Sequence, residues 1–276
     1  MNLTSKIKTE LNELGIKPRK SLGQNFLIND GIYQKILEAA DVGKKDTILE
    51  IGPGLGTLTE YLSRTGASVI AVEKDRFLAN YLAKKFESAK NVRIIEGDIL
   101  KSKIENLELK DNDYKVVGNI PYYITSHLLR IIFEKWPQSR SVVLMVQKEV
   151  AQRIVAKPPR MSMLAVSVQY FVEPKIISYV SKGNFFPPPD VDSAIIKLIP
   201  HPISDPVSFQ QIFFEVVRTG FSGKRKQLIN NLSKKLKNKT EIQDKLTSVG
   251  IDPQRRAETL TIGEWRKITN ILYLPG

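Results

Sequence analysis

Short runs of apolar residues, many of them β-branched, alternate with longer amphipathic stretches in the first half of the chain. Such runs are typical of strands buried on both faces of a parallel sheet, and the stretches between them have the spacing of helices. The pattern therefore predicts an α/β fold with a mostly parallel sheet. We expect strands at 47–51, 68–72, 92–95, 115–117 and 141–146, and helices at 57–64, 76–86 and 124–135.

The regions on either side of this alternation have a different pattern. Before it, apolar residues at helical spacing predict a short amphipathic helix that ends near Gly15, and a basic segment at 17–27 follows. After it, two apolar runs at 164–171 and 191–198 have no long helix between them. Because a parallel connection needs a long crossover, we expect these two runs to form an antiparallel edge of the sheet.

A change in composition near residue 200 marks the expected domain boundary. Three prolines lie close together there, and the rest of the chain has the apolar spacing of helices throughout. We therefore predict a sheet-containing domain at 1–200 and a small helical domain at 201–276. The length agrees, since 276 residues suffice for one large domain or two smaller ones.

The chain is strongly basic, with 42 Lys and Arg against 29 Asp and Glu and a formal net charge of +13. This excess favours an anionic partner, such as nucleic acid, a membrane surface or an acidic protein, and a basic surface that only maintains solubility is the alternative. Residues 201–276 hold 13 basic and 7 acidic residues, a net charge of +6. Within them, 221–240 contains seven basic residues and no acidic one, where a solvated helix face is again the alternative.

Several kinds of chemistry are disfavoured by the residue types that are missing. The absence of cysteine excludes disulfides, a thiolate nucleophile and Cys-ligated metals, and the two histidines, His127 and His201, are far apart in the sequence. No apolar run reaches the roughly 18 residues of a membrane span. The N-terminal segment also lacks the apolar core of a secretory signal. We expect a cytoplasmic protein that needs no metal and does not enter a membrane.

Three acidic residues lie at the C-terminal ends of successive predicted strands. Glu50 opens the glycine-rich segment 50–56, Glu73 ends the second strand and Asp98 ends the third. Because ligands of open α/β sheets bind at the carboxyl ends of the strands, we expect these carboxyl groups at one site. Glu73 lies 21 residues after Gly52, which suits an acceptor for ribose hydroxyl groups. Asp98 is then available to the exocyclic amine of an adenine.

The glycine spacing distinguishes between two kinds of cofactor. Dinucleotide-binding loops have the spacing Gly-x-Gly-x-x-Gly, and a pyrophosphate lies at the helix N-terminus. Here the spacing is Gly-x-Gly-x-Gly, and Glu50 precedes it. A carboxylate at this place disfavours a pyrophosphate but suits a cation such as the sulfonium or amino group of S-adenosylmethionine. A tight turn without a ligand is the alternative, and an NAD-dependent oxidoreductase is disfavoured. The loop resembles motif I of the class I S-adenosylmethionine-dependent methyltransferases.

The second candidate motif, Asn119-Ile120-Pro121-Tyr122, follows the fourth predicted strand. Asn and Pro are ordinary turn residues, so a simple strand exit is the alternative. The tetrapeptide resembles the motif of amino-methyltransferases that act on adenine N6. The resemblance implies that Asn119 Oδ1 and the Ile120 carbonyl accept from the two N6–H groups and that Tyr122 stacks on the base. Such acceptors bind most strongly to the positive charge that develops on N6 in the transition state.

Taken together, the motifs resemble those of the ribosomal RNA adenine N6-dimethyltransferase family. The similarity is greatest to the bacterial small-subunit branch, which dimethylates two adjacent adenosines near the 3′ end of 16S rRNA. Further strings similar to family signatures lie at 20–27, 145–151, 185–194 and 221–232. The implied fold is a Rossmann-like methyltransferase sheet with a helical C-terminal domain. The implied S-adenosylmethionine-binding residues are Gln24, Asn25, Leu27, Glu50, Gly52, Gly54, Glu73, Lys74, Asp98, Ile99 and Asn119.

The same resemblance implies an aromatic residue that closes on the target base. Phe185 holds the aligned position, and Phe186 beside it is the alternative. With Asn119, Ile120, Pro121 and Tyr122, Phe185 completes the expected catalytic set. The expected RNA-binding residues are Arg19, Lys20, Lys148, Arg153, Lys224, Arg225 and Lys226.

Three interpretations of the function remain open at this point. The first is dimethylation of small-subunit rRNA by a monomer, with the small ribosomal subunit as partner. The second is the same chemistry on large-subunit rRNA, which Ile120 favours because many small-subunit enzymes carry Leu there, whereas 221–232 favours the small subunit. The third is an RNA-binding assembly factor without catalysis. No role is assigned to the loop at 158–163.

Overall fold

The computed structural model describes residues 2–19, 23–102, 104–236 and 238–273. Contacts divide the chain into two compact units, Met1–Ala151 with Glu173–Pro200, and Gln152–Val172 with His201–Gly276. The second unit thus includes a segment that precedes residue 200, and the domain limits expected from the sequence stay a prediction. No helix in the described ranges combines the length and the apolar character needed to cross a membrane.

The first unit is built around a seven-stranded sheet with the strand order β4-β3-β2-β5-β6-β9-β7. Neighbours from β4 to β6 pair parallel, and β9 pairs antiparallel with β6. The predicted α/β class with a mostly parallel sheet and an antiparallel edge is therefore confirmed. The strands are β2 (Thr47–Ile51), β3 (Ser68–Glu73), β4 (Val92–Glu96), β5 (Tyr114–Asn119), β6 (Ser141–Gln147), β7 (Val172–Val180) and β9 (Ser193–Pro200).

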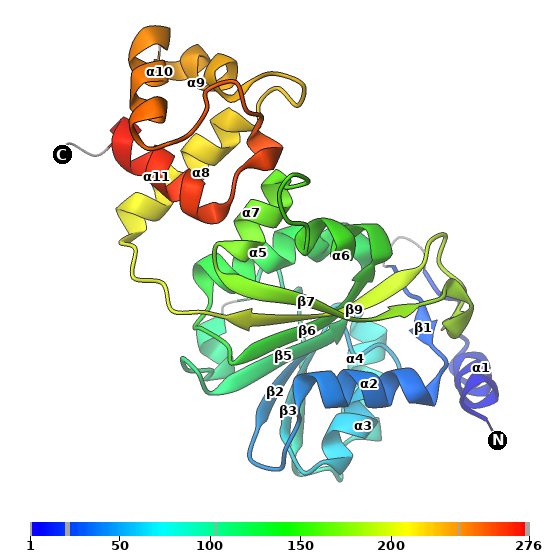
Figure 1. Ribbon diagram of the computed structural model, residues 1–276. Helices are drawn as coiled ribbons and strands as arrows, with labels where there is room; N and C mark the ends of the chain where they lie inside the picture. The colour runs from blue at the N-terminus through cyan, green and yellow to red at the C-terminus, as the bar shows by residue number, and fades with distance from the viewer. Residues whose placement is uncertain (1, 20–22, 103, 237, 274–276) are drawn as a thin grey trace. The chain divides into compact units, whose positions relative to one another are not determined.

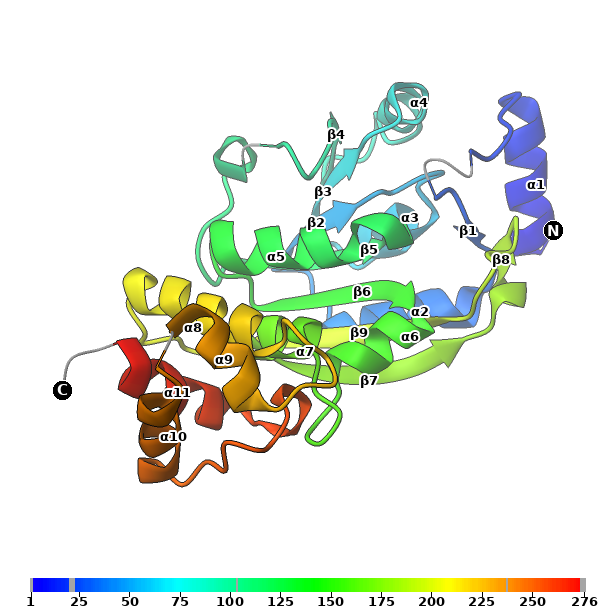
Figure 2. The ribbon, with the colours of Figure 1, turned by 90° about the horizontal axis from the view of Figure 1, so that it is seen from above.

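Helices cover both faces of this sheet, with α2 and α3 on one face and α5 on the other (Figures 1 and 2). The helix expected at the start of the chain and the three expected between strands are all present. Helix α2 was not among the expected elements. The helices that begin in this unit are α1 (Leu3–Glu13), α2 (Asp30–Ala40), α3 (Thr57–Arg64), α4 (Arg76–Lys85), α5 (Thr125–Lys135) and α6 (Lys148–Ile154).

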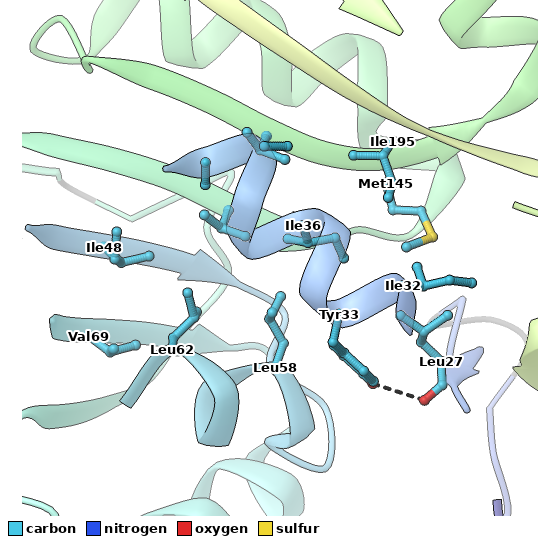
Figure 3. Close-up of a cluster of buried hydrophobic side chains, with 14 of the residues drawn as sticks. Leu27, Ile32, Tyr33, Ile36, Ile48, Leu58, Leu62, Val69, Met145 and Ile195 are labelled. Atoms are coloured by element: carbon cyan, nitrogen blue, oxygen red, sulfur yellow. Dashed lines mark hydrogen bonds between the residues drawn. The ribbon is translucent and has the colours of Figure 1, made fainter. Parts of the chain in front are cut away.

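The core on the α2 face is continuous from the helices to the sheet (Figure 3). Ile32 and Ile36 of α2 are 8% and 2% exposed, and they pack with apolar side chains of α3 and of the strands. The hydroxyl of buried Tyr33 donates a hydrogen bond to the carbonyl of Leu27 at 2.9 Å. This bond anchors the N-terminal segment, which leads to the carboxyl edge of the sheet.

A second, two-stranded sheet joins segments that are far apart in the sequence. Strand β1 (Phe26–Leu27) pairs antiparallel with β8 (Phe185–Phe186), with Phe26 opposite Phe186 and Leu27 opposite Phe185. Sequence periodicity did not predict this pairing, because two residues are too few to show alternation. The pair fixes the segment that lies against the glycine-rich loop.

The second unit is helical in its described part. Its helices are α7 (Met163–Gln169), α8 (Val207–Gly220), α9 (Leu228–Leu236), α10 (Lys239–Ser248) and α11 (Ile262–Tyr273). Fully buried Trp265 of α11 packs so closely on α8 that a Cβ at Gly220 would lie 2.3 Å from its ring. The helical C-terminal region expected from apolar spacing is therefore confirmed.

One predicted strand is wrong. The run at 164–171 forms helix α7 for most of its length, and the edge strand β7 begins directly after it. Ser162 caps the helix by accepting a hydrogen bond from the Ala165 amide at 3.1 Å. The run is apolar nearly throughout, so its pattern did not distinguish a buried helix from a strand.

Candidate active site

A cavity opens at the carboxyl ends of the parallel strands, where the sequence places its acidic residues. Its walls come from the N-terminal segment, the loops after β2, β3 and β4, and the end of β5. All of the residues expected to bind the cofactor line this one cavity: Gln24, Asn25, Leu27, Glu50, Gly52, Gly54, Glu73, Lys74, Asp98, Ile99 and Asn119. The structure thus brings the complete set together, and their binding role stays a prediction.

Glu73 shapes the glycine-rich loop from the neighbouring strand. Its Oε2 accepts a hydrogen bond from the Gly54 amide at 3.0 Å, and its Oε1 accepts from the Asp75 amide at 2.8 Å. Gly52 and Gly54 adopt φ angles of 68° and 62°, which side chains with a Cβ rarely adopt. Burial raises the pKa of Glu73, although the two backbone hydrogen bonds lower it. Both oxygens act as acceptors, so the geometry suits the ionised carboxylate, and each oxygen keeps a second lone pair.

Glu50 lies deeper in the same cavity and is 1% exposed. Its Oε2 accepts a hydrogen bond from Thr59 Oγ1 at 2.7 Å. Burial raises the pKa of Glu50 to about 8 in spite of this bond, and the negative charge of Glu73 adds to the rise. The raised pKa favours the protonated form of Glu50 near neutral pH, whereas both oxygens of Glu73 accept backbone hydrogen bonds, as an ionised carboxylate does.

Lys74 and Asp98 form an ion pair at the cavity, with 3.0 Å between Nζ and Oδ2. The Leu100 amide donates to the other carboxylate oxygen at 3.1 Å. Burial raises the pKa of Asp98, but the bonds from Lys74 and Leu100 outweigh it and hold the pKa below its ordinary value. Asp98 is thus an ionised acceptor. Among the described residues there is no group of three or more His, Asp or Glu side chains suited to hold a metal ion.

The N-terminal segment lies directly against the Asn119–Tyr122 tetrapeptide. Gly23 has a φ of +64°, and a Cβ on it would come within 2.7 Å of Pro121 Cβ. The carbonyl of Asn25 accepts a hydrogen bond from Asn119 Nδ2 at 3.1 Å. With its amide nitrogen used in this way, Asn119 keeps Oδ1 as an acceptor at the cavity, and no donor among the described residues is bonded to that oxygen.

The other tetrapeptide residues have distinct places. Pro121 lines the cavity, whereas the side chain of Ile120 is 2% exposed and packs inward. Tyr122 begins a short 3-10 helix, η3 (Tyr122–Ile124), and does not line the cavity. Its hydroxyl forms a hydrogen bond of 2.5 Å with Ser193 Oγ. Burial raises the pKa of Tyr122, while the bond to Ser193 lowers it in part.

Sequence reasoning missed Tyr123, which is 61% exposed and lines the cavity. Two consecutive tyrosines after Pro121 were the available signal. Phe185 is 2% exposed and belongs to the core cluster around α2, and Phe186 packs near α1 with Lys8 Nζ 5.0 Å from its ring centre. Neither Phe185 nor Phe186 lines the cavity, and their closure on a base stays a prediction.

Three of the expected RNA-binding residues share a loop of the second unit. Lys224, Arg225 and Lys226 are exposed between α8 and α9. Buried Asn231 braces this basic loop, because its Nδ2 donates to the carbonyls of Gly220 at 2.6 Å and Gly223 at 3.1 Å. The loop therefore has a defined backbone while its cations face solvent.

The structure describes three of the remaining expected RNA-binding residues. Arg19 is exposed and lies 3.5 Å from Asp75, and Lys148 Nζ lies 5.3 Å from the ring centre of Tyr179. Arg153 is exposed on α6. Lys20 is outside the described residues.

Comparison with known proteins gives consistent matches. A family model described as ribosomal RNA adenine dimethylase matches residues 15–273. Ribosomal RNA small subunit methyltransferase A of Dehalococcoides mccartyi (strain CBDB1) is 45% identical over 97% of this chain and 92% of its own length. The protein of the same name from Geobacillus kaustophilus (strain HTA426) is 42% identical over 96% of this chain and 94% of its own length.

Two solved structures resemble the fold over most of the chain. A dimethyladenosine transferase from Plasmodium falciparum has a TM-score of 0.73 and 29% identity, and it covers 88% of this chain and 95% of its own. The 23S rRNA methyltransferase ErmE has a TM-score of 0.72 and 25% identity, and it covers 90% of this chain and 99% of its own. The sheet with its antiparallel edge is thus shared with known methyltransferases.

Proposed function

The chain belongs to the ribosomal RNA adenine dimethylase family, and from this premise we propose its substrate and the roles of its residues. The protein is an S-adenosylmethionine-dependent methyltransferase. It transfers methyl groups to N6 of two adjacent adenosines near the 3′ end of small-subunit rRNA and produces N6,N6-dimethyladenosine. Its biological role is maturation of the small ribosomal subunit in the cytoplasm, and it acts as a monomer.

The orientation of Asn119 is the observation that carries this proposal. Its Nδ2 is held by the Asn25 carbonyl, so Oδ1 is fixed as an acceptor at the end of β5. The N6 lone pair of adenine is delocalised into the ring, and an acceptor on an N6–H favours a nitrogen with an available lone pair. The bond strengthens as positive charge develops on N6, so it accelerates the reaction rather than only binding the base. The carbonyl of Ile120 is the proposed second acceptor.

The donor set of the cavity fits S-adenosylmethionine. When bound, this group supplies an electrophilic methyl on a sulfonium. Glu73 has free lone pairs on both oxygens for ribose hydroxyls, and ionised Asp98 accepts from the adenine amine. Gly52 and Gly54 have no Cβ atoms that would limit the approach of a ligand, and the N-terminal residues Gln24, Asn25 and Leu27 line the same cavity.

The basic residues are proposed to bind the RNA backbone. Lys224, Arg225 and Lys226 contact phosphates from the braced loop, and Arg19, Lys20, Lys148 and Arg153 add contacts elsewhere. Phosphate contacts position a protein without reading sequence, so the choice of the target base falls to the pocket. With domain limits of 1–200 and 201–276, the pocket would lie in the first domain, and Lys224, Arg225 and Lys226 would lie in the second.

The small subunit is favoured over the large one by sequence. Relatives that are 42–45% identical over nearly the whole chain are named small subunit methyltransferases, whereas the 23S enzyme ErmE is 25% identical. The signature at 221–232 coincides with the basic loop and the start of α9. Large-subunit RNA is the second candidate, because ErmE shares the fold with a TM-score of 0.72.

Product analysis tests the proposal directly. Purified protein is incubated with labelled S-adenosylmethionine and either unmethylated small subunits or large-subunit RNA, and the digested nucleosides are identified. We expect N6,N6-dimethyladenosine from the small subunit alone. Product only from large-subunit RNA would support the second candidate, and cofactor binding without product would indicate a non-catalytic assembly factor.

A further inference from the structure

The hydroxyl of the Tyr122 ring is held by Ser193, a residue of the string at 185–194 to which no role has been assigned. Ser193 Oγ lies 2.5 Å from the Tyr122 hydroxyl, and Ser193 is fully buried. Ser193 begins β9 and stands opposite Gln147 of β6 in the antiparallel ladder. Because β6 lies between β5 and β9, the Tyr122 side chain reaches from the end of β5 past β6 to its partner.

The anchor itself is rigid. Directly before Ser193, the Asp192 carbonyl accepts from the Lys148 amide at 3.0 Å, and Asp192 Oδ1 accepts from the Lys182 amide at 3.1 Å. The start of β9 is therefore fixed to the start of α6 and to the loop after β7. A hydroxyl on such a support restricts the torsions of the tyrosine bonded to it.

We propose that Ser193 is a positioning residue for the target base, because its hydroxyl fixes the ring of Tyr122 before RNA binds. The inference rests on the proposed function and on the expectation from the sequence that Tyr122 stacks on the target adenine. A ring that is already immobile does not lose side-chain freedom when the base arrives. Immobilising one side chain on binding typically costs about three- to tenfold in affinity. The bond to Ser193 avoids this cost because Tyr122 is already immobilised before the RNA binds.

The test uses the full-length protein and removes the bond from each end. Tyr122→Phe, Ser193→Ala and the double variant are compared in steady-state methylation of unmethylated small subunits. We expect each single variant to lower kcat/KM for the RNA about three- to tenfold, mainly through KM. The double variant should be no worse than either single one, because the same bond is removed. Affinity for S-adenosylhomocysteine should not change, since neither side chain lines the cavity.

Two further variants separate positioning from packing. Ser139→Ala removes another buried serine hydroxyl, which has no hydrogen-bond partner among the described residues, and should leave KM unchanged. Ser193→Thr keeps a hydroxyl and should restore most of the lost activity. The inference would be overturned if the losses in kcat/KM of the two single variants multiplied in the double variant. Wild-type kinetics for Ser193→Ala, or a loss in Ser139→Ala as large as that in Ser193→Ala, would overturn it as well.

A readout without RNA distinguishes this inference from the proposed function. If the wild-type protein methylates no ribosomal RNA, the proposed function fails while the restraint on Tyr122 can still be measured. Averaging of the χ1 torsion of labelled Tyr122 is measured by NMR couplings in the wild-type protein and in Ser193→Ala. More averaging in the variant is expected, and an unchanged χ1 distribution would overturn the role of Ser193 whatever the substrate.

Discussion

Two asparagine side chains brace the two regions on which the proposed function depends, but they do so differently. At the cofactor edge, Asn119 donates to the Asn25 carbonyl and is itself the residue that faces the cavity. In the basic loop, Asn231 donates to the Gly220 and Gly223 carbonyls and is fully buried, while other residues carry the charge. At the cofactor edge, one residue, Asn119, both makes the structural hydrogen bond and carries the functional group. In the basic loop, Asn231 makes the structural hydrogen bonds, and other residues carry the functional groups.

This difference bears on how each region tolerates change. The carboxyl groups of the cofactor edge have fixed partners, and Glu50 and Glu73 are buried, so one substitution there removes one defined interaction. The basic loop has exposed cations in high dielectric, and each contributes a modest, salt-dependent share. Substitutions at the edge should therefore give large effects that salt hardly alters, and those in the loop should give smaller effects that salt alters strongly.

The largest effect is expected for Asn119→Ala. Loss of the acceptor for N6–H removes a hydrogen bond to a developing charge, which corresponds to roughly a 10- to 150-fold loss in kcat. Cofactor affinity should be largely kept, and single-turnover methylation with titrated cofactor separates the two. Asn91→Ala is the matched control, since Asn91 also donates to backbone carbonyls, those of Ser63 and Ala67, but lies outside the cavity. A wild-type rate for Asn119→Ala would disprove the proposed activation of N6.

Glu73→Gln should weaken the cofactor complex about 10- to 100-fold. An amide can accept from only one of the Gly54 and Asp75 backbone amides, so one donor loses its partner and one ribose acceptor is lost. Calorimetry with S-adenosylhomocysteine measures this. Glu96→Gln, at the position opposite Glu73 on β4, should leave the affinity unchanged. Equal losses in both variants would contradict the assigned role.

Glu50→Gln should change how stability depends on pH. The folded-state pKa of Glu50 is about 8 against an ordinary value of 4.5, so between these values the folded chain holds a proton that the unfolded chain has released. The free energy of unfolding of the wild-type protein therefore falls as pH rises, by roughly 1 kcal/mol per pH unit from this group. Urea unfolding at pH 5.5, 6.5 and 7.5 should show a flatter profile for Glu50→Gln. Parallel profiles would mean that Glu50 is ionised in the folded chain.

The smallest effect is expected for Lys224→Glu combined with Lys226→Glu. RNA affinity should fall about five- to tenfold at moderate salt, and the slope of log K against log salt should become shallower by about 1.5. Filter binding to small subunits over a salt series measures both. Lys44→Glu with Lys45→Glu changes the net charge equally at the amino end of β2, and it should have little effect. Unchanged binding at all salt concentrations would remove the basic loop from the interface.

The sequence predicted the cofactor edge well because strand periodicity and acidic strand ends are local signals. Glu50, Glu73 and Asp98 lie at or just after the ends of strands that the pattern locates, and parallel pairing brings those ends together. The fate of the run at 164–171 could not be inferred, because an apolar segment without a clear period fits a buried helix as well as a strand. The helix α7 forms there with Ser162 as its cap.

Contacts between distant segments were beyond sequence reasoning. The bond from Tyr122 to Ser193 and the pairing of β1 with β8 depend on tertiary placement, and no periodicity encodes either. Tyr123, which the structure exposes at the cavity, was overlooked for the same reason. Phe185, named from the resemblance, packs in the core, and its closure on the base stays a prediction.

The pairing of β1 with β8 also sets an order of events during synthesis. Strand β1 leaves the ribosome early, but its partner, Phe185–Phe186, follows about 160 residues later. A nascent chain that already contains β2 to β6 has the strand ends and loops that line the cavity. The N-terminal segment, which lines it as well, still lacks the strand with which β1 pairs. We therefore expect full cofactor affinity only late in translation, after the antiparallel edge has begun to form, and weaker cofactor binding by incomplete chains.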